Sequence, residues 1–173
     1  MARQAPDRYV APTVQRLRLR YAKRGRLRFS SHRDFQRALE RALRWAEVPM
    51  AYSAGFHPHP KVSYANSAPT GVASEAEYVE LGVSATCDPE AVRAALDAAL
   101  PEGLDVLDVV EARTPDFVNR LEASVWRVEL PGVPHDRAVA AVTALLAADE
   151  VIVERLMKNG LRTFDARGAV LAA

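Results

Sequence analysis

Polar and apolar residues alternate strictly along residues 15–22, which run Gln-Arg-Leu-Arg-Leu-Arg-Tyr-Ala. Such alternation is typical of a β-strand with one buried face, because successive side chains point to opposite faces of a sheet. The segment Lys23-Arg24-Gly25 interrupts the alternation, as a bulge or a kink does, and the alternation resumes over residues 26–29. The pattern therefore predicts either one long bent strand or a hairpin across residues 15–29.

Apolar residues at helical spacing replace this alternation in residues 31–46. Ser31 is a good N-cap, and Asp34 stands three residues later, where the acidic member of a capping box belongs. Pro49 follows the segment and cannot continue a helix. The apolar face of the predicted helix consists of Phe35, Ala38, Leu39, Ala42 and Leu43.

Shorter patterns complete a first set of elements. A second helix begins after Asp88, a helix-capping residue, with Pro89 at its first position. We predict further strands at residues 50–53, 62–65, 77–84 and 104–110. When one of the two short strands, at 50–53 or at 62–65, is counted, the order is strand, helix, strand, strand, helix, strand, which is the order of a ferredoxin-like unit.

A second, shorter round of elements follows. Its members are a strand at 124–130, a helix at 136–148, and strands at 151–157 and 161–164 joined by the hairpin signal Asn159-Gly160. We therefore expect an α+β protein with tandem ferredoxin-like (βαββαβ) units, the second of which is incomplete. The expected division is a flexible N-terminal lead (1–14), a ferredoxin-like unit with a basic face (15–112) and a partial second unit (113–173).

The charges are segregated along the chain, although the formal net charge is only +1. Residues 1–64 contain 14 Lys and Arg against 4 Asp and Glu, which leaves +10, whereas residues 65–173 contain 9 against 18, which leaves −9. Such asymmetry points to a polyanion-binding face on one part of the molecule. The alternative is that the two halves attract each other in the fold, and the two explanations are compatible.

Arginine accounts for the basic face. On a strand, Arg16, Arg18 and Arg20 share one face, and guanidinium groups match phosphate with planar, bidentate donors. The density of arginine favours anion binding, while the alternative is a strand paired with acidic cross-strand neighbours such as Glu77, Glu80 or Glu129.

Arg33, Arg37, Arg41 and Arg44 form a further stripe on the predicted helix, which a solvated helix surface would also explain. The candidate nucleic-acid-binding residues are Arg16, Arg18, Arg20, Arg26, Arg28, Arg33, Arg37, Arg41 and Lys61.

The loop His57-Pro58-His59-Pro60-Lys61 is the second candidate site. Its prolines hold the backbone extended, so that both imidazoles are presented to a partner. Phe56 and Tyr64 flank the loop and could stack on a base. Candidate catalytic residues are His32, His57 and His59, but two histidines do not make a metal site, and a rigid structural turn is the plainer explanation of the loop.

Composition excludes several other classes of protein. The single cysteine, Cys87, permits no internal disulfide, which fits a reducing, cytoplasmic setting, and rules out an iron–sulfur cluster ligated by cysteines of this chain alone. No apolar stretch reaches the length of about 18 residues that a membrane span needs, and the first 13 residues lack the apolar core of a secretory signal. We expect no cofactor and no metal bound by the chain itself.

Three segments together resemble one known family. They are LRFSSHRD at 27–34, YSAGFHPHPK at 52–61 and PTGVASEAEY at 69–78. The family is the radical-SAM-linked domain family, a bacterial group of uncharacterised function that usually has leucine at the position of Ser31 and a longer C-terminal tail. The resemblance implies a radical SAM protein as partner, which would supply the cluster that this chain cannot build.

The favoured hypothesis is an RNA- or polyanion-binding accessory domain that works with a radical SAM partner in RNA modification or processing. Two alternatives remain open. The first is an RNA-processing or RNA-modifying enzyme that uses the His57/His59 loop, so the sequence leaves open whether the chain is an enzyme. The second is a protein-interaction domain of a radical SAM enzyme that binds no nucleic acid.

Overall fold

The computed structural model describes residues 10–65 and 67–173, and the chain divides into two compact units. The first unit ends at Ser124 and the second comprises Val125–Ala173. Most of the predicted N-terminal lead, residues 1–14, lies outside the described residues. Among the helices that are described, none combines the length and the apolar character needed to cross a membrane.

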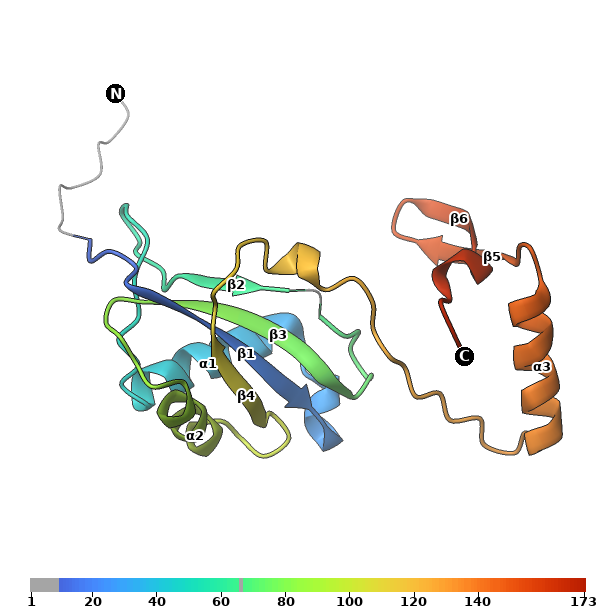
Figure 1. Cartoon of the computed structure of the whole chain (residues 1–173), viewed down its shortest axis with the longest axis horizontal. Coiled ribbons are helices and arrows are strands. Elements are labelled where there is room, and N and C mark those ends of the chain that lie inside the picture. Colours follow the sequence, from blue (N-terminus) through green and yellow to red (C-terminus); the bar gives the residue numbers. More distant parts are fainter. Residues whose placement is uncertain (1–9, 66) are drawn as a thin grey trace, which may run out of the picture. The chain divides into compact units, whose positions relative to one another are not determined.

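The first unit is a four-stranded antiparallel sheet with two α-helices (Figure 1). The strands are β1 (Gln15–Lys23), β2 (Val62–Tyr64), β3 (Ser74–Val83) and β4 (Val106–Glu111). The helices are α1 (His32–Trp45) and α2 (Pro89–Ala99), with short 3-10 helices η1 (Gly25–Phe29) and η2 (Val118–Arg120). The strands lie in the order β2-β3-β1-β4. The mixed α+β class and the predicted order of strands and α-helices in this unit are confirmed.

The predicted alternation places β1 at the centre of the sheet. Leu17, Leu19 and Tyr21 are buried, and each pairs with a residue of β3 and a residue of β4. The arginines of β1 occupy the opposite face, as side chains on successive residues must. The strand therefore supplies both the floor of the core and one polar surface of the unit.

Helix α1 forms where its cap and periodicity predict it. The Ser31 hydroxyl accepts a hydrogen bond from the backbone N–H of Asp34 (3.2 Å), and the Asp34 carboxylate accepts one from the backbone N–H of Ser31 (3.1 Å). The Ser31 hydroxyl also donates a hydrogen bond to the Asp34 carboxylate (2.6 Å), and this bond, with the one from the Ser31 N–H, holds the pKa of Asp34 below its usual value. The predicted apolar face is buried throughout and joins β1, β3 and α2 in one core; it consists of Phe35, Ala38, Leu39, Ala42 and Leu43.

The strand predicted at residues 26–29 is wrong. Gly25 has a φ of +52°, and the chain turns there into η1, where the N–H of Leu27 bonds to the carbonyl of Arg24 (3.0 Å). Arg24 itself donates its N–H to the carbonyl of Gly103 (2.8 Å), which ends the run of β1. Arg26 and Arg28 therefore do not continue the face formed by the arginines of β1.

The short strand predicted at residues 50–53 is reduced to two isolated bridges. Met50 pairs with Val83, and Tyr52 pairs with Pro60. A proline lacks the N–H that a regular ladder requires, so pairing at Tyr52 cannot extend into a strand. The segment still runs beside the sheet, because the N–H of Ala51 bonds to the carbonyl of Gly82 (2.8 Å).

The second unit contains one α-helix, α3 (His135–Ala147), and one antiparallel hairpin of β5 (Ile152–Met157) and β6 (Gly160–Asp165), followed by a short 3-10 helix, η3 (Arg167–Ala169). The hairpin predicted around Asn159-Gly160 is confirmed, and Gly160 adopts a positive φ of +114° at its turn.

The strand predicted at residues 124–130 is wrong. In the described part of the chain, residues 124–130 belong to neither of the two sheets and are not assigned to a strand. Val125 is consequently fully exposed. The structure therefore does not show a tandem pair of ferredoxin-like units.

Truncation of Leu39 tests the role of α1 in the core. Leu39 is 1% exposed, so Leu39→Ala should lower the free energy of unfolding by about 2–5 kcal/mol through lost burial and a residual cavity. The measurement is urea denaturation followed by circular dichroism. The control is Val110→Ala, which removes two methyl groups from a side chain that is 55% exposed and should change stability by less than about 0.5 kcal/mol. Equal losses in both variants would contradict the assignment of Leu39 to the core.

Candidate nucleic-acid interface

The arginines of β1 lie on the face of the sheet away from the helices, and each has an acidic partner. Arg16 and Arg18 both pair with Glu80, at 3.2 and 2.9 Å, and Arg20 pairs with Asp108 at 2.6 Å. Glu80 lies directly opposite Arg18 in β3, and Asp108 lies opposite Arg20 in β4, so the register of the sheet sets these pairs. Of the acidic cross-strand neighbours considered from the sequence, Glu80 is therefore present at this face, and Asp108 is a further one that the sequence analysis did not name.

Arg18 is the most engaged of these arginines. Its guanidinium group also donates hydrogen bonds to the hydroxyl (3.0 Å) and the carbonyl oxygen of Thr114, and lies 5.4 Å from the centroid of the Phe117 ring. An anion that approached Arg18 would have to compete with two oxygen acceptors and an aromatic ring.

The other two acidic residues named from the sequence lie elsewhere. Glu77 pairs with Tyr21 in the register of the sheet and therefore points to the buried face, where both carboxylate oxygens accept the N–H of Ala68 (3.2 and 3.1 Å). Glu129 belongs to the second unit and pairs with Arg127 at 3.0 Å. Glu80 and Asp108 are thus the residues that compensate the arginines of β1.

Helix α1 carries the opposite arrangement of charge. Arg33, Arg37, Arg41 and Arg44, here called the arginine stripe, are all exposed on the side of α1 away from its buried face. None of the four makes an ion pair with any residue in 10–65 or 67–173. The uncompensated positive charge of the first unit therefore lies on α1 rather than on β1.

Two further arginines continue this uncompensated charge along the chain. Arg26 and Arg28 lie in η1, which immediately precedes α1, and both side chains are exposed. Arg28 lies over the ring of Phe29, 4.7 Å from its centroid, and neither arginine pairs with a carboxylate of the described residues. A cation held over a ring keeps its donors free for a phosphate.

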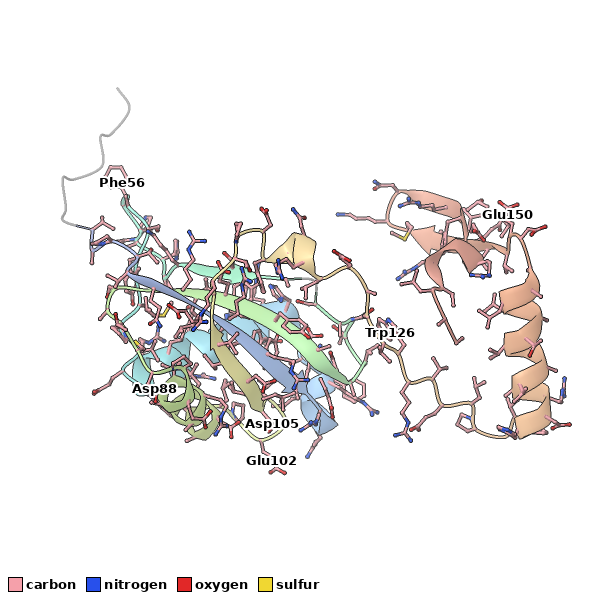
Figure 2. All side chains as sticks on the ribbon, viewed as in Figure 1. Phe56, Asp88, Glu102, Asp105, Trp126 and Glu150 are labelled. Atoms are coloured by element: carbon pink, nitrogen blue, oxygen red, sulfur yellow. The ribbon has the colours of Figure 1, made fainter. Side chains whose placement is uncertain are left out.

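The proline loop is anchored at its base. Ser53 and His59 exchange two hydrogen bonds: the N–H of Ser53 donates to the carbonyl of His59 (2.9 Å), and the N–H of His59 donates to the Ser53 hydroxyl (3.0 Å). Phe56 and His57 are exposed at the tip of the loop, where Phe56 projects outward (Figure 2). Lys61 follows the loop and donates to the hydroxyl of Thr13 (3.1 Å).

His32 and Tyr64 are engaged in packing contacts near the start of α1. The two ring nitrogens of His32 are hydrogen-bonded to Ser67 (2.9 Å) and Gln36 (3.0 Å), and the ring meets Tyr64 edge-on at 5.0 Å between centroids. Tyr64 also contacts Phe35 edge-on, and burial raises its pKa to about 12, with a smaller contribution from Glu40. Tyr64 is therefore not presented as a free platform for a base.

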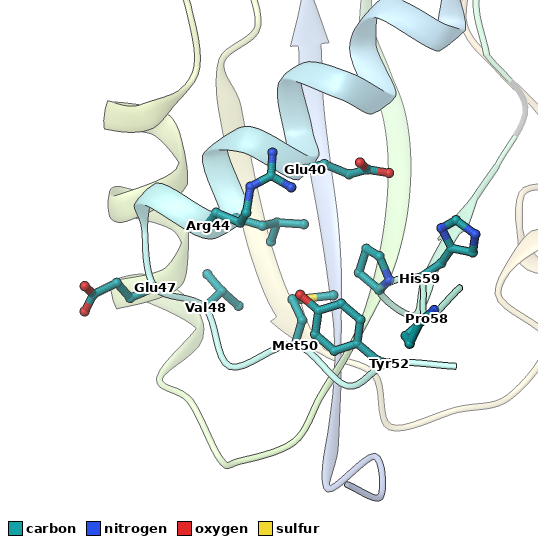
Figure 3. A pocket seen from close by; sticks show the side chains of 10 residues that line it. Glu40, Arg44, Glu47, Val48, Met50, Tyr52, Pro58 and His59 are labelled. Atoms are coloured by element: carbon teal, nitrogen blue, oxygen red, sulfur yellow. The ribbon is translucent and has the colours of Figure 1, made fainter. Parts of the chain in front are cut away.

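His59 lines a pocket between α1 and the proline loop. We call it the α1–loop pocket; its volume is about 350 Å³ (Figure 3). Its lining consists of Glu40, Leu43, Arg44, Glu47, Val48, Met50, Tyr52, Pro58, His59 and Pro60. Of the residues singled out from the sequence as candidate sites, the pocket gathers only His59 and Arg44.

Glu40, Glu47 and Tyr52 also line this pocket, and the pattern of the sequence did not single them out. The one available signal was the i, i+4 spacing of Glu40 and Arg44, which places both along one side of α1; Glu47 follows the end of the helix, with a positive φ of +50°. Tyr52 offers no such signal, because only the folded loop brings it opposite the helix. No group of three or more His, Cys, Asp or Glu suited to a metal ion occurs in the described part of the chain.

A family model matches residues 16–173, from β1 to the last residue. The chain belongs to this family, which is described as an uncharacterized protein conserved in bacteria (DUF2344). The match includes the arginine stripe, the α1–loop pocket and the whole second unit of this DUF2344 member. No curated protein matches the chain. The family description names no activity or partner, so the radical SAM association stays a prediction.

Glu80→Gln tests whether the arginines of β1 serve the fold. Glu80 is 7% exposed, and its carboxylate accepts hydrogen bonds from two arginines. Loss of its charge should therefore lower the free energy of unfolding of this DUF2344 protein by about 1–3 kcal/mol. The measurement is the free energy of unfolding in urea at moderate salt. Glu102→Gln removes the same charge from an exposed loop and serves as the control, with little change expected. Stability that is equal in the two variants would show that the pairs with Glu80 contribute nothing to the fold.

Proposed function

We propose that this protein binds RNA through the arginine stripe of α1 together with Arg26 and Arg28. The observation that carries the proposal is that these six guanidinium groups are exposed and make no ion pair with the described residues. Like charges at i, i+4 spacing disfavour a helix, and a bound polyphosphate backbone relieves that repulsion. Guanidinium groups that hold no carboxylate keep their forked donors available for phosphate.

The arginines of β1 have a secondary part in this proposal. Arg16, Arg18 and Arg20 remain candidate contacts, but each would have to exchange an existing carboxylate partner for a phosphate. Such an exchange contributes less to the free energy of RNA binding than a phosphate that neutralises an unpaired arginine, because one ion pair only replaces another. Phe56 and His57, which are exposed at the tip of the proline loop, and Lys61, which follows the loop, are proposed as peripheral contacts.

We also infer that the first unit is a ferredoxin-like unit and that the second is part of another. The support is the order βαββαβ together with the antiparallel sheet order β2-β3-β1-β4, in which β1 and β3 are central and β2 and β4 are the edges. In the second unit only the helix and the hairpin support the inference.

The protein is further proposed to act as an accessory domain for a radical SAM partner in the cytoplasm. The support is the resemblance of residues 27–34, 52–61 and 69–78 to domains linked to such enzymes. In this arrangement the chain holds the RNA and the partner supplies the iron–sulfur cluster, for which a chain with one cysteine has too few thiolate ligands.

Two matched charge variants test the RNA proposal. Arg33→Gln/Arg37→Gln on α1 and Arg16→Gln/Arg20→Gln on β1 each remove two positive charges, and all four side chains reach solvent. The α1 variant should weaken binding of cellular RNA at least about tenfold at low salt and reduce the slope of log K against log salt by about 1–2. The β1 variant should bind nearly as well as the parent protein. A larger loss in the β1 variant would move the interface to the sheet, and RNA binding that is independent of salt would contradict the proposal.

Affinity purification from a bacterial extract tests the partner. Tagged protein should retain a radical SAM enzyme, identified by mass spectrometry, and RNA that is released by raised salt. Nuclease treatment separates the two contacts, because a direct protein contact survives it. Recovery of the enzyme without RNA would favour a pure protein-interaction domain, and recovery of RNA without the enzyme would contradict the accessory role.

A further inference from the structure

The α1–loop pocket has walls that are held in place without a ligand. One wall is α1, and the other is the proline loop, whose base is fixed by the bonds between Ser53 and His59 and by the bond from the N–H of Lys61 to the carbonyl of Ala51 (2.8 Å). Two prolines, Pro58 and Pro60, restrict the loop further. A pocket formed in advance spares a ligand the entropic cost of ordering the site.

The polar groups around this pocket have no partner within the described protein. Glu40, Arg44 and Glu47 make no ion pair, and neither the Tyr52 hydroxyl nor the His59 ring forms a hydrogen bond with a residue in 10–65 or 67–173. The floor, by contrast, is apolar and includes the buried side chains of Leu43 and Met50. An apolar floor with a few convergent polar groups is typical of a small-molecule site, and about 350 Å³ is within the usual size range.

The placement of these side chains distinguishes one carboxylate from the other. Figure 3 shows Glu40 directed toward the side of the pocket formed by Pro58 and His59, whereas Glu47 points the opposite way. Tyr52 presents its ring below the helix, and 43% of the residue is exposed. Arg44 lines the pocket one helical turn after Glu40. A planar ligand on Tyr52 would share the pocket with the carboxylate of Glu40, an acceptor, and the guanidinium group of Arg44, a donor.

Arg44 also belongs to the arginine stripe, so the pocket opens at the end of the proposed RNA-binding surface. Resting on that proposed function, we propose that the pocket holds one unstacked guanine of a single-stranded RNA whose phosphates lie along the stripe. Proteins that recognise RNA sequence commonly splay out single bases and stack them on aromatic side chains. Tyr52 is the stacking platform of this site.

Guanine is the base whose edges match the lining. Its adjacent N1–H and 2-amino groups donate to one carboxylate, which is the role of Glu40, and its O6 and N7 accept from one guanidinium, which is the role of Arg44. Adenine offers no such pair of adjacent donors, and uracil offers a single N–H. The site therefore selects guanine through one acceptor group and one donor group on neighbouring turns of α1.

The test compares three RNA oligomers of about ten nucleotides, a length that spans a typical single-strand site. Each has one central purine, either guanine, inosine or adenine, in an adenine- and uracil-rich context, and binding to the full chain is measured by fluorescence anisotropy. The parent protein should prefer guanine to adenine by about 5–100-fold, with inosine between them because it lacks the 2-amino group. Glu40→Gln and Tyr52→Ala should reduce this preference to less than about twofold while affinity for the adenine oligomer persists.

Two control variants separate the pocket from the stripe. Glu102→Gln removes the same charge from an exposed loop that does not line the pocket and should keep the guanine preference. Arg33→Gln/Arg37→Gln should weaken binding of all three oligomers by the same factor. Circular dichroism confirms that each variant is folded, and the conservative Glu40→Gln carries the test if Tyr52→Ala does not fold.

The outcomes that overturn the inference differ from those that overturn the proposed function. Equal binding of the three oligomers by the parent protein, or a preference that survives in folded Glu40→Gln, overturns the guanine site and leaves RNA binding by the stripe intact. Failure to bind any oligomer at low salt overturns both. A preference lost in Glu47→Gln but not in Glu40→Gln overturns the assignment of the carboxylate.

Discussion

The alternation of β1 constrains the rest of the first unit. Because Leu17, Leu19 and Tyr21 must face the helices to form the core, the arginines between them must face the other way. Three guanidinium groups on one strand are tolerable only when acidic residues lie across from them. The antiparallel neighbours on both sides supply these in Glu80 and Asp108, so hydrophobic burial on one face and charge compensation on the other depend on the same register.

Charge compensation on the sheet determines where the uncompensated charge lies. Glu80 and Asp108 of β3 and β4 pair with the arginines of β1, while Glu75 of β3 and Asp105, which precedes β4, pair with Arg24. Helix α1 has no equivalent partners: Asp34 is engaged with Ser31 in its cap, and Glu40 makes no ion pair within the described chain. The segregation of charge along the sequence thus becomes a difference between two faces of one unit. Only the face on α1 keeps its positive charge available for an external anion.

The α1–loop pocket follows from the same helix. Residues of α1 that lie between its buried face and the arginine stripe face the proline loop. Because the base of that loop is held by hydrogen bonds, a pocket remains between the loop and the helix. Arg44 is shared by the stripe and the pocket, which is how one helix can both hold a phosphate backbone and select a base. The proposed function and the proposed guanine site are therefore two properties of one amphipathic element.

The sequence by itself determined the local elements and their burial. Strand β1, helix α1 with its capping box, helix α2 and the β5–β6 hairpin follow from periodicity, caps and turn residues, which act between near neighbours in the chain. The tertiary structure alone decided whether an alternating segment becomes a strand: residues 26–29 turn into η1, and residues 124–130 find no ladder partner among the described residues, because pairing is a contact between distant segments. The tertiary structure also decided which arginines have an acidic partner. Arg16 and Arg37 are equally charged in the sequence, and only the register that brings Glu80 beside Arg16 makes the difference between an ion pair and an unpaired charge.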